Sequence, residues 1–407
     1  MQSDRLPLDS AARADLALFT IKEHAMDNFT FFNPTTIEFG ADKEQGIGQH
    51  LATHGVKRVL LCYGSDRIKR EGLFDVVGKR LAEKGIELVE CGGIVSNPVI
   101  SKVREGIALA RQHQVDAILS VGGGSVLDSA KAIAAGVGYS GDVWDLFIGK
   151  AAIDSALPLF AILTLAATGS EMNPGAVVTN EDTQQKFFIS SPALFPKVSI
   201  VNPVLMRGVS RDYLAYSAAE VIAHLIEVYF TAAVHPKLQS RLVESVINTI
   251  IETTEALQSD PKDDNARAQF AWAATLALNG LTSSGASGFS YPNHAIEHSL
   301  SALFNVPHGA GLSVVMPAWM KWYHGRNPAQ FQRFAREVFD MDTAEQGIAA
   351  LEQWFDKIGT PTRLQQLGIK EADLAAIVDN VQVNVRGFGI ADTYTPEVVT
   401  AILKSAL

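Results

Sequence analysis

Apolar and polar residues follow two different patterns along this chain, and the pattern changes near residue 203. Between residues 57 and 165, short apolar runs bounded by Gly, Ser, Asn or Pro alternate with stretches of helical periodicity. We expect strands at Arg58–Cys62, Glu87–Cys91, Ala117–Val121 and Leu157–Leu165, and helices at Phe74–Lys84 and Ile100–His113. Such alternation predicts parallel strands with helices on both faces of the sheet.

Beyond Asn202-Pro203, long stretches rich in Ala, Leu, Ile and Glu follow, and almost nothing alternates with a period of two. We expect helices over 211–232, 237–258, 264–280, 292–304, 308–323, 327–340 and 343–357, with shorter ones at 371–380 and 395–405. The predicted fold class is α/β plus all-α. Residues 1–25 would be an N-terminal extension, residues 26–203 an α/β domain and residues 204–407 a helical domain.

The composition excludes several classes of partner. The chain has 34 Lys+Arg against 44 Asp+Glu, a formal net charge of −10, and no basic run that would attract nucleic acid or an anionic membrane. No apolar run reaches the roughly 20 residues that a transmembrane helix needs. The two cysteines, Cys62 and Cys91, are too few for a disulfide framework or a thiolate metal site. We therefore expect a cytoplasmic protein whose ligands are small molecules.

A glycine-rich turn joins the expected strand at 117–121 to the next helix. Gly122, Gly123 and Gly124 would let a diphosphate approach the backbone, and the helix after them offers free N–H groups and the positive end of its dipole. The spacing is neither G-x-G-x-x-G nor that of a Walker sequence. The turn favours a phosphate cradle, and a tight strand-to-helix turn without a ligand is the alternative.

Other polar groups are expected at the same edge of the sheet, where open α/β sheets bind ligands. Thr164, Thr168 and Ser170 follow one apolar strand, and Asn97 follows another. Their hydroxyl and amide groups would hold ribose or diphosphate oxygens, or else cap a helix.

The residues after the first strand indicate NAD more than NADP. Asp66 would accept the ribose hydroxyl protons and repel a 2′-phosphate. Arg67, Lys69 and Arg70 favour the opposite, because a 2′-phosphate would bind to them, and all four charges could equally form a solvated face.

The helical half contains histidines at a suggestive spacing. Glu220 and His224 are four residues apart, as are His294 and His298, so each pair shares one face of a helix. His308 follows in Val-Pro-His-Gly. Three histidines and one carboxylate form a ligand set suited to Fe(II) or Zn(II). One pair alone could be a surface or core feature, but two pairs and a His-Gly turn are harder to attribute to chance.

These motifs, in this order, resemble those of the group III, iron-dependent alcohol dehydrogenases. The matching segments are Gly-Gly-Gly-Ser-x-x-Asp at 122–128, Thr-x-x-x-Thr-Gly-Ser-Glu at 164–171, Glu-x-x-x-His at 220–224 and His-x-x-x-His-x9-His-Gly at 294–309. The resemblance spans about residue 28 to the C-terminus. It implies a Rossmann-like N-terminal domain, a helical C-terminal domain, a homodimer, and a cleft that holds a nicotinamide dinucleotide and a divalent metal.

Carried over by position, the resemblance assigns three sets of residues. The dinucleotide would be held by Asn97, Gly123, Gly124, Ser125, Asp128, Thr164 and Thr168, with Lys186 near the ribose. The metal would be bound by Glu220, His224, His294 and His308. His298 would lie near the substrate and relay a proton. Glu220 stands where the family usually has aspartate, so its longer side chain must fold back or shift the helix.

The resemblance implies an enzyme that oxidises a primary alcohol to an aldehyde, or the reverse, by hydride transfer. A cation would stabilise the alkoxide that forms before transfer. Hydroxyl and amide groups suggest a polyol, although capping and turn formation also explain them; they belong to Asn173, Ser284, Ser287, Tyr291 and Asn293. A fainter likeness points to the branch that oxidises the C8 hydroxyl of 3-deoxy-manno-octulosonate.

Two other functions would use the same glycine turn. A dehydroquinate synthase-like lyase would consume and regenerate NAD within one turnover, so no net NADH would appear. A non-catalytic dinucleotide-binding sensor would need no metal.

Overall fold

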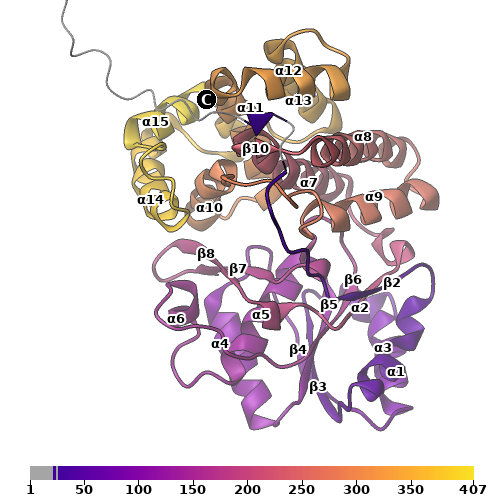
Figure 1. The fold of residues 1–407 in the computed structure, drawn as a ribbon. Helices are drawn as coiled ribbons and strands as arrows, with labels where there is room; N and C mark the ends of the chain where they lie inside the picture. Colours follow the sequence, from indigo (N-terminus) through magenta and orange to yellow (C-terminus); the bar gives the residue numbers. More distant parts are fainter. Residues whose placement is uncertain (1–21, 24–25) are drawn as a thin grey trace, which may run out of the picture.

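The computed structural model describes residues 22–23 and 26–407, and Figure 1 shows two parts, one above the other. The lower part contains the main sheet, and the upper part is built almost entirely from helices. The predicted extension over 1–25 lies outside the described residues except for Lys22–Glu23, which form strand β1. Strand β1 pairs in parallel with β10 (Val234–His235) of the upper part.

A six-stranded parallel sheet forms the centre of the lower part. Its strands lie in the order β2 (Thr36–Phe39), β9 (Val198–Val201), β6 (Leu159–Leu163), β5 (Ala117–Gly122), β3 (Arg58–Tyr63) and β4 (Glu87–Cys91). Strands β5 and β6 are buried along their whole length, as expected for a sheet covered on both faces. The predicted parallel sheet is therefore confirmed.

Two groups of helices cover the two faces of this sheet. One face packs against α1 (Ile47–Thr53) and α3 (Leu73–Ala82), the other against α4 (Ile100–Gln112) and α5 (Gly124–Val137). Strand β3 shows the division, because Val59 and Leu61 belong to the first apolar cluster and Leu60 and Cys62 to the second. Helices α2 (Arg67–Arg70) and α6 (Trp144–Phe147) are short.

The order of the strands opens a crevice at one edge of the sheet. After β3 the chain passes outward to β4 and then returns to the other side of β3 to form β5. The helices after β3 and β5 therefore lie on opposite faces, and ligands of open α/β sheets bind at such a divergence. Gly64 and Gly122 stand at the carboxyl ends of these two strands.

Strands β2 and β9 and the hairpin of β7 (Gly175–Asn180) and β8 (Gln185–Ser190) are absent from the predicted set. Strands β2 and β9 have four residues each, too few for a periodic signal. The hairpin pairs antiparallel outside the main sheet and mixes polar with apolar residues. In Figure 1 it lies at the top of the lower part, beneath α10 and α14.

The predicted helices of the second half are confirmed to within a few residues, except that residues 371–373 form a 3₁₀ turn before the helix at 374 and the helix there continues further. They are α7 (Arg211–Thr231), α8 (Lys237–Ser259), α9 (Asp264–Ala277), α10 (Pro292–Phe304), α11 (His308–Tyr323), α12 (Pro328–Phe339), α13 (Ala344–Ile358), α14 (Leu374–Gly387) and α15 (Pro396–Ser405). Within the described ranges, none of the helices has the length and apolar character to span a bilayer.

Helix α7 runs through the interior of the helical part. Apart from Tyr216, every residue from Ala215 to Phe230 is buried. A helix buried on all sides has no solvent-facing stripe, so its polar side chains must find partners inside the protein.

Candidate active site

A cavity of about 1100 Å³ lies between the α/β part and the helical part. The α/β part lines it with residues that follow β3, β5 and β6 and with the β7–β8 hairpin, and the helical part with α7, α10, α11 and the end of α14. A second cavity of about 390 Å³ adjoins it, since Gly64, Gly123 and Thr164 line both. The space therefore runs from the crevice of the sheet to the buried helices.

The glycine turn forms the floor of this space at the start of α5. Gly123 is the N-cap residue of α5, and Gly123, Gly124 and Ser125 line the larger cavity, so the first turn of the helix faces it. A Cβ atom on Gly124 would lie 2.2 Å from Cγ2 of Thr168. Packing therefore requires a glycine here too, and the exposed helix start remains suited to an anion.

Asp128 lines the cavity, but its carboxylate is already occupied by the protein. It accepts hydrogen bonds from Ser170 Oγ at 2.7 Å and from the backbone N–H of Val177 at 2.9 Å. Burial raises the pKa of this carboxyl. Asp128 thus holds the polar loop after β6 in place, and its predicted contact with a dinucleotide stays a prediction.

Lys131, three residues further along α5, is a buried charge that the sequence analysis missed. Its ammonium group donates to Ser170 O at 2.7 Å, Asn173 O at 2.8 Å and Gly175 O at 2.8 Å. The signal was available, because Lys131 is a lone cation among the small and apolar residues of α5. A buried charge is costly unless the protein supplies hydrogen-bond acceptors for it.

Asn97 and Lys186 lie where the two parts meet. Asn97 Nδ2 donates to the carbonyl of Val306 at 2.9 Å, and Lys186 Nζ donates to Asn97 Oδ1 at 3.0 Å. The same ammonium lies 3.3 Å from His308 Nδ1 and 3.6 Å from Glu297 Oε2. Lys186 therefore contacts His308 directly. Its expected position near a ribose stays a prediction.

Asp66 is the one predicted cofactor residue that lines neither cavity. Its side chain is 68 % exposed, and its Oδ1 lies 3.9 Å from Lys69 Nζ. The neighbours Ser65 and Arg67 line both cavities. Helix α2 begins directly after Asp66, and the turn directs that carboxylate to solvent.

Three helices bring the four predicted metal ligands together. Glu220 and His224 lie one turn apart on α7, His294 is in the first turn of α10, and His308 begins α11. The ring centroids of His224 and His294 are 5.0 Å apart, and those of His294 and His308 are 5.3 Å apart. The Nε2 atom of His308 lies 3.9 Å from Glu220 Oε1. Imidazoles that share a tetrahedral ion have centroids roughly 5 Å apart.

A glycine after His308 makes this approach possible. A Cβ atom on Gly309 would lie 2.0 Å from the carbonyl oxygen of Tyr216 on α7. Only glycine lets α11 touch α7 this closely, which explains why the His-Gly pair is a useful signal.

Two fully buried glutamates that the sequence analysis missed orient two of the histidines. Glu227 accepts hydrogen bonds from Nδ1 of His294 and from the backbone N–H groups of Asn293 and His294. Glu297 accepts from Nδ1 of His308. A carboxylate on one ring nitrogen fixes the tautomer and leaves the other nitrogen as an acceptor, which is the arrangement of metal-bound histidines.

Both glutamates had a signal in the sequence. Glu227 is seven residues after Glu220, so both lie on the face of α7 that carries His224. Glu297 stands between the two histidines of α10. Spacing identifies residues that can share an ion, but it does not identify the residues that orient them.

The cluster contains buried nitrogen atoms that the protein leaves without a hydrogen bond. In the part of the chain that the structure describes, His294 Nε2 and His224 Nδ1 have no partner. Burial lowers the pKa of His224 and of His308 well below the usual value, so both rings are neutral near pH 7. Burial raises the pKa of Glu220 to about 7. Neutral rings, free ring nitrogens and a poorly solvated carboxyl fit a cation well.

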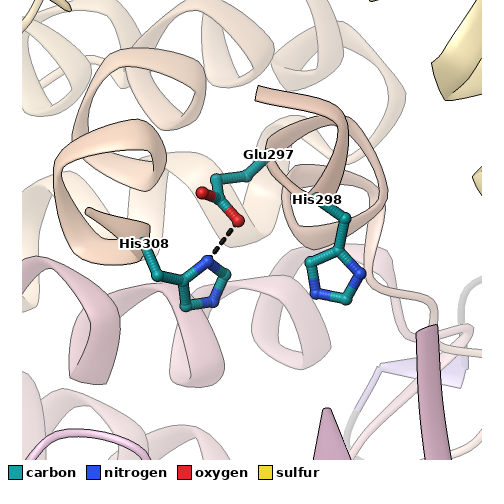
Figure 2. A group of neighbouring side chains, drawn as sticks. All are labelled: Glu297, His298 and His308. Atoms are coloured by element: carbon teal, nitrogen blue, oxygen red, sulfur yellow. Dashed lines mark hydrogen bonds and ion pairs between the residues drawn. The ribbon is translucent and has the colours of Figure 1, made fainter. Parts of the chain in front are cut away.

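A neighbouring group could also be considered as a metal centre. Ligand atoms of Glu297, His298 and His308 lie within 4.8 Å of one another. Figure 2 shows the Glu297 carboxylate pointing at the His308 ring, with His298 beside them. The Lys186 ammonium lies 3.6 Å from this carboxylate and would repel a second cation there. This group is better suited to orienting His308.

His298 faces the cavity with one free ring nitrogen. Its Nδ1 donates to the backbone carbonyl of Lys186 at 3.0 Å, so Nε2 carries the lone pair of the neutral ring. Burial lowers the pKa of His298 well below its usual value, and Lys186 lowers it further. The ring can therefore accept a hydrogen bond from a substrate hydroxyl.

Comparison with known protein families gives two matches that together cover most of the chain. The family described as iron-containing alcohol dehydrogenase matches residues 34–203. The C-terminal domain of the Fe-containing alcohol dehydrogenase family matches residues 214–407.

Individual proteins match over nearly the whole length. A probable NADH-dependent butanol dehydrogenase 1 of Bacillus subtilis is 39 % identical over 390 residues, which is 94 % of this chain and 100 % of that protein. The NADPH-dependent aldehyde reductase YqhD of Escherichia coli is 32 % identical over 88 % of this chain and 93 % of its own length. The crystal structure of NADH-dependent butanol dehydrogenase A from Thermotoga maritima superimposes with a TM-score of 0.92 at 45 % identity, covering 94 % of this chain and 99 % of that one.

Proposed function

The chain belongs to the iron-containing alcohol dehydrogenase family, and on that premise we propose that it interconverts a primary alcohol and an aldehyde in the cleft between its two parts. As a member of this family it is an oxidoreductase that uses NAD(P) and a divalent metal. The observation that carries the proposal is the convergence of Glu220, His224, His294 and His308 on the cavity that the glycine turn also lines.

These four residues are the proposed ligands of the divalent cation. A cation bound there would lower the pKa of a substrate hydroxyl and polarise an aldehyde oxygen, and a nicotinamide would exchange the hydride. Glu227 would hold the proton of His294 on Nδ1 so that Nε2 is the nitrogen turned to the cation, and Glu297 would do the same for His308. His298 Nε2 is the proposed acceptor of the hydroxyl proton, because Nδ1 is committed to the Lys186 carbonyl.

The dinucleotide is proposed to extend from the smaller cavity to the larger one. Its diphosphate would lie on the first turn of α5, at Gly123, Gly124 and Ser125, with Thr164 and Thr168 beside it. Among the residues that line the smaller cavity are the carboxylates Glu44 and Glu71.

Acidic groups near the ribose support NAD over NADP, since a 2′-phosphate would be repelled. Arg67 offers a weaker objection than the sequence suggested, because its guanidinium is bonded to Glu71 at 2.9 Å. Because the same pair offsets the charge of Glu71, the preference for NAD rests on Glu44 rather than on Asp66.

The lining of the cavity supports an apolar alcohol more than a polyol. Ser284 Oγ donates to Gly280 O at 2.8 Å, and Ser287 Oγ donates to Asp27. Neither of them, nor Asn293, lines the cavity, so three of the five polar groups expected to bind a polyol lie elsewhere. A straight-chain primary alcohol or its aldehyde is the proposed substrate, in keeping with the butanol dehydrogenases that this chain resembles.

The test is turnover on protein of defined metal content. Chelator-treated protein reloaded with Fe(II) or Zn(II) should convert butanal and NADH to butanol and NAD, whereas metal-free protein should not. Deuterium at the nicotinamide C4 position should appear on the carbinol carbon of the product. Bound dinucleotide without net conversion for any alcohol or aldehyde would contradict the proposal and favour the lyase or the sensor.

A further inference from the structure

Strand β8 contacts the helical part at several points, and these contacts reach the candidate active site. The carbonyl of Gln184, just before β8, accepts a hydrogen bond from Asn380 Nδ2 on α14 at 2.9 Å. The Lys186 carbonyl accepts from His298 Nδ1. The Phe188 ring packs against Phe388 with centroids 5.5 Å apart. The contacts of Lys186 and Phe188 are two residues apart on the strand and therefore lie next to each other.

Phe388 also contacts His298, the proposed proton acceptor. It directly follows α14, and its ring lies 5.9 Å from that of His298 at 66°. Phe188 and Phe388 both line the larger cavity. The Phe388 ring thus stands beside the proposed proton acceptor, and Phe188 from the other part of the protein packs on Phe388.

Phe188 is unusual for a phenylalanine in a hairpin, because it is 49 % exposed. Large apolar side chains that remain exposed at the wall of a cavity are candidates for contact with a ligand. Phe388 lies between Gly387 and Gly389, and Gly389 has a φ of +70°. A Cβ atom on either glycine would meet no other atom within 4 Å, so the loop around Phe388 is sterically open.

We propose that Phe188 and Phe388 form the wall on which the alkyl chain of the substrate lies, and that this pair selects apolar chains over polyols. The inference rests on the proposed function and adds the residues that set its specificity. Each methylene that leaves water against such a wall should raise kcat/KM about fourfold. A hydroxyl group held against two phenyl rings would lose its hydrogen bonds to water without replacement.

A second aromatic pair makes the proposal specific. Phe289 and Tyr291 also line the cavity, with centroids 6.1 Å apart, and Tyr291 lies 5.8 Å from His294. Both come from the helical part and stand on the side of His294. The proposal assigns the chain to the His298 side, where the two parts of the protein meet.

The experiment measures kcat/KM for the straight-chain aldehydes from propanal to octanal, and for glyceraldehyde, with NADH and metal-loaded protein. Wild type should gain about fourfold per methylene over the first members of the series and prefer butanal to glyceraldehyde at least about tenfold. F388A and F188A should flatten the series to less than about twofold per methylene. Both should leave the affinity for NADH unchanged.

Three further variants separate this role from a merely structural one. F388L should restore part of the dependence on chain length, because it replaces the apolar wall without the ring. F32A removes a phenyl that is 59 % exposed and packs on Phe195 outside the cavity, so it should leave the series unchanged. F289A should leave the slope per methylene intact.

An unchanged slope in both F388A and F188A would overturn the inference, as would a loss of slope in F289A alone. An active wild type with no dependence on chain length would overturn the inference and leave the proposed function standing. Wild type that reduces no aldehyde with either dinucleotide would overturn both.

Discussion

Two buried lysines in this protein differ in what surrounds them. Lys131, inside the α/β part, donates to several oxygen atoms of one segment, which runs from the loop after β6 to the first residue of β7. Lys186, at the cleft, donates to Asn97 at 3.0 Å but lies 3.6 Å from Glu297, a residue of the other part. The first lysine holds the α/β part together, whereas the second lies between the two parts, at the candidate active site.

The two regions also differ in their buried polar atoms that have no hydrogen-bond partner. Around Lys131, Glu171 has one oxygen without a partner, but burial raises the pKa of this carboxyl, so a proton can replace the charge. At the cleft, among the described residues, His224 Nδ1 and His294 Nε2 stay unpartnered although they are buried. A buried polar atom without a partner costs about 1–3 kcal/mol. We infer that a ligand offsets this cost at the cleft and that none is needed around Lys131.

The largest effect should follow from removing a histidine of the cleft. H294A should lower kcat/KM by about a thousandfold or more and abolish stoichiometric metal, because it removes a proposed ligand whose orientation Glu227 fixes. Metal analysis and steady-state kinetics measure both effects. The affinity for NADH should change little, since His294 lies at the helical end of the cavity.

H113A is the matched control, because His113 ends α4 outside the cavity. It should keep metal and rate. If H294A also kept both, His294 would not be a ligand, and the cleft would lose its distinction from the region of Lys131.

The second effect concerns stability. K131M should lower the free energy of unfolding by about 3–5 kcal/mol, because it leaves Asp128 and several carbonyl groups buried without their cation. Denaturant or thermal unfolding measures the change. K150M, which breaks the exposed pair with Asp145, should cost less than about 1 kcal/mol. Equal effects of the two changes would mean that Lys131 does not hold the loop in place.

Burial also explains which elements and site residues could be predicted from the sequence. Strands β3, β5 and β6 were predictable, because a strand buried almost throughout is a nearly continuous apolar run, whereas β8 is half buried and carries no such run. The candidate metal ligands were found by spacing, since residues four apart share a helical face.

The residues that the sequence analysis missed depend on contacts between distant segments. Lys131 bonds to residues 39 to 44 positions away, and Glu297 of the helical part lies beside Lys186 of the α/β part. The outward direction of Asp66 has a local reason, because α2 begins directly after it, and its contact with a dinucleotide stays a prediction. Periodicity reports which face a residue lies on, but it does not report which segment will cover that face.

A smaller effect should follow from changing the residue that orients His294. E227Q should weaken metal binding by about 10- to 100-fold, because an amide cannot fix the ring tautomer as a carboxylate does. Competition with a chelator measures the affinity. E252Q, an exposed change on α8, should have no effect. Unchanged affinity in E227Q would limit Glu227 to capping the start of α10, and the cleft would then resemble the purely structural region around Lys131.

The smallest effect should come from Glu352, whose two cationic partners are partly exposed to water. The unfolding free energy that this group contributes can be compared with that of the buried Lys131. Glu352 accepts from Lys321 Nζ at 2.6 Å and from Arg363, and both cations are 42 % exposed. Burial alone would raise the pKa of Glu352, but the two hydrogen bonds outweigh burial and lower it below 4.5. The stabilisation is therefore complete above pH 4.5 and is lost as the pH falls through the lowered value.

Wild type should exceed E352Q in unfolding free energy by about 0.5–1 kcal/mol at neutral pH, and the difference should vanish toward strongly acidic pH. Parallel denaturation curves of the two proteins measure it, and other titrations cancel in the difference. A difference as large as that of K131M, or one that persists in acid, would mean that exposure does not weaken a charge pair here. The difference between the region of Lys131 and the cleft would then rest only on the histidine nitrogens without a partner.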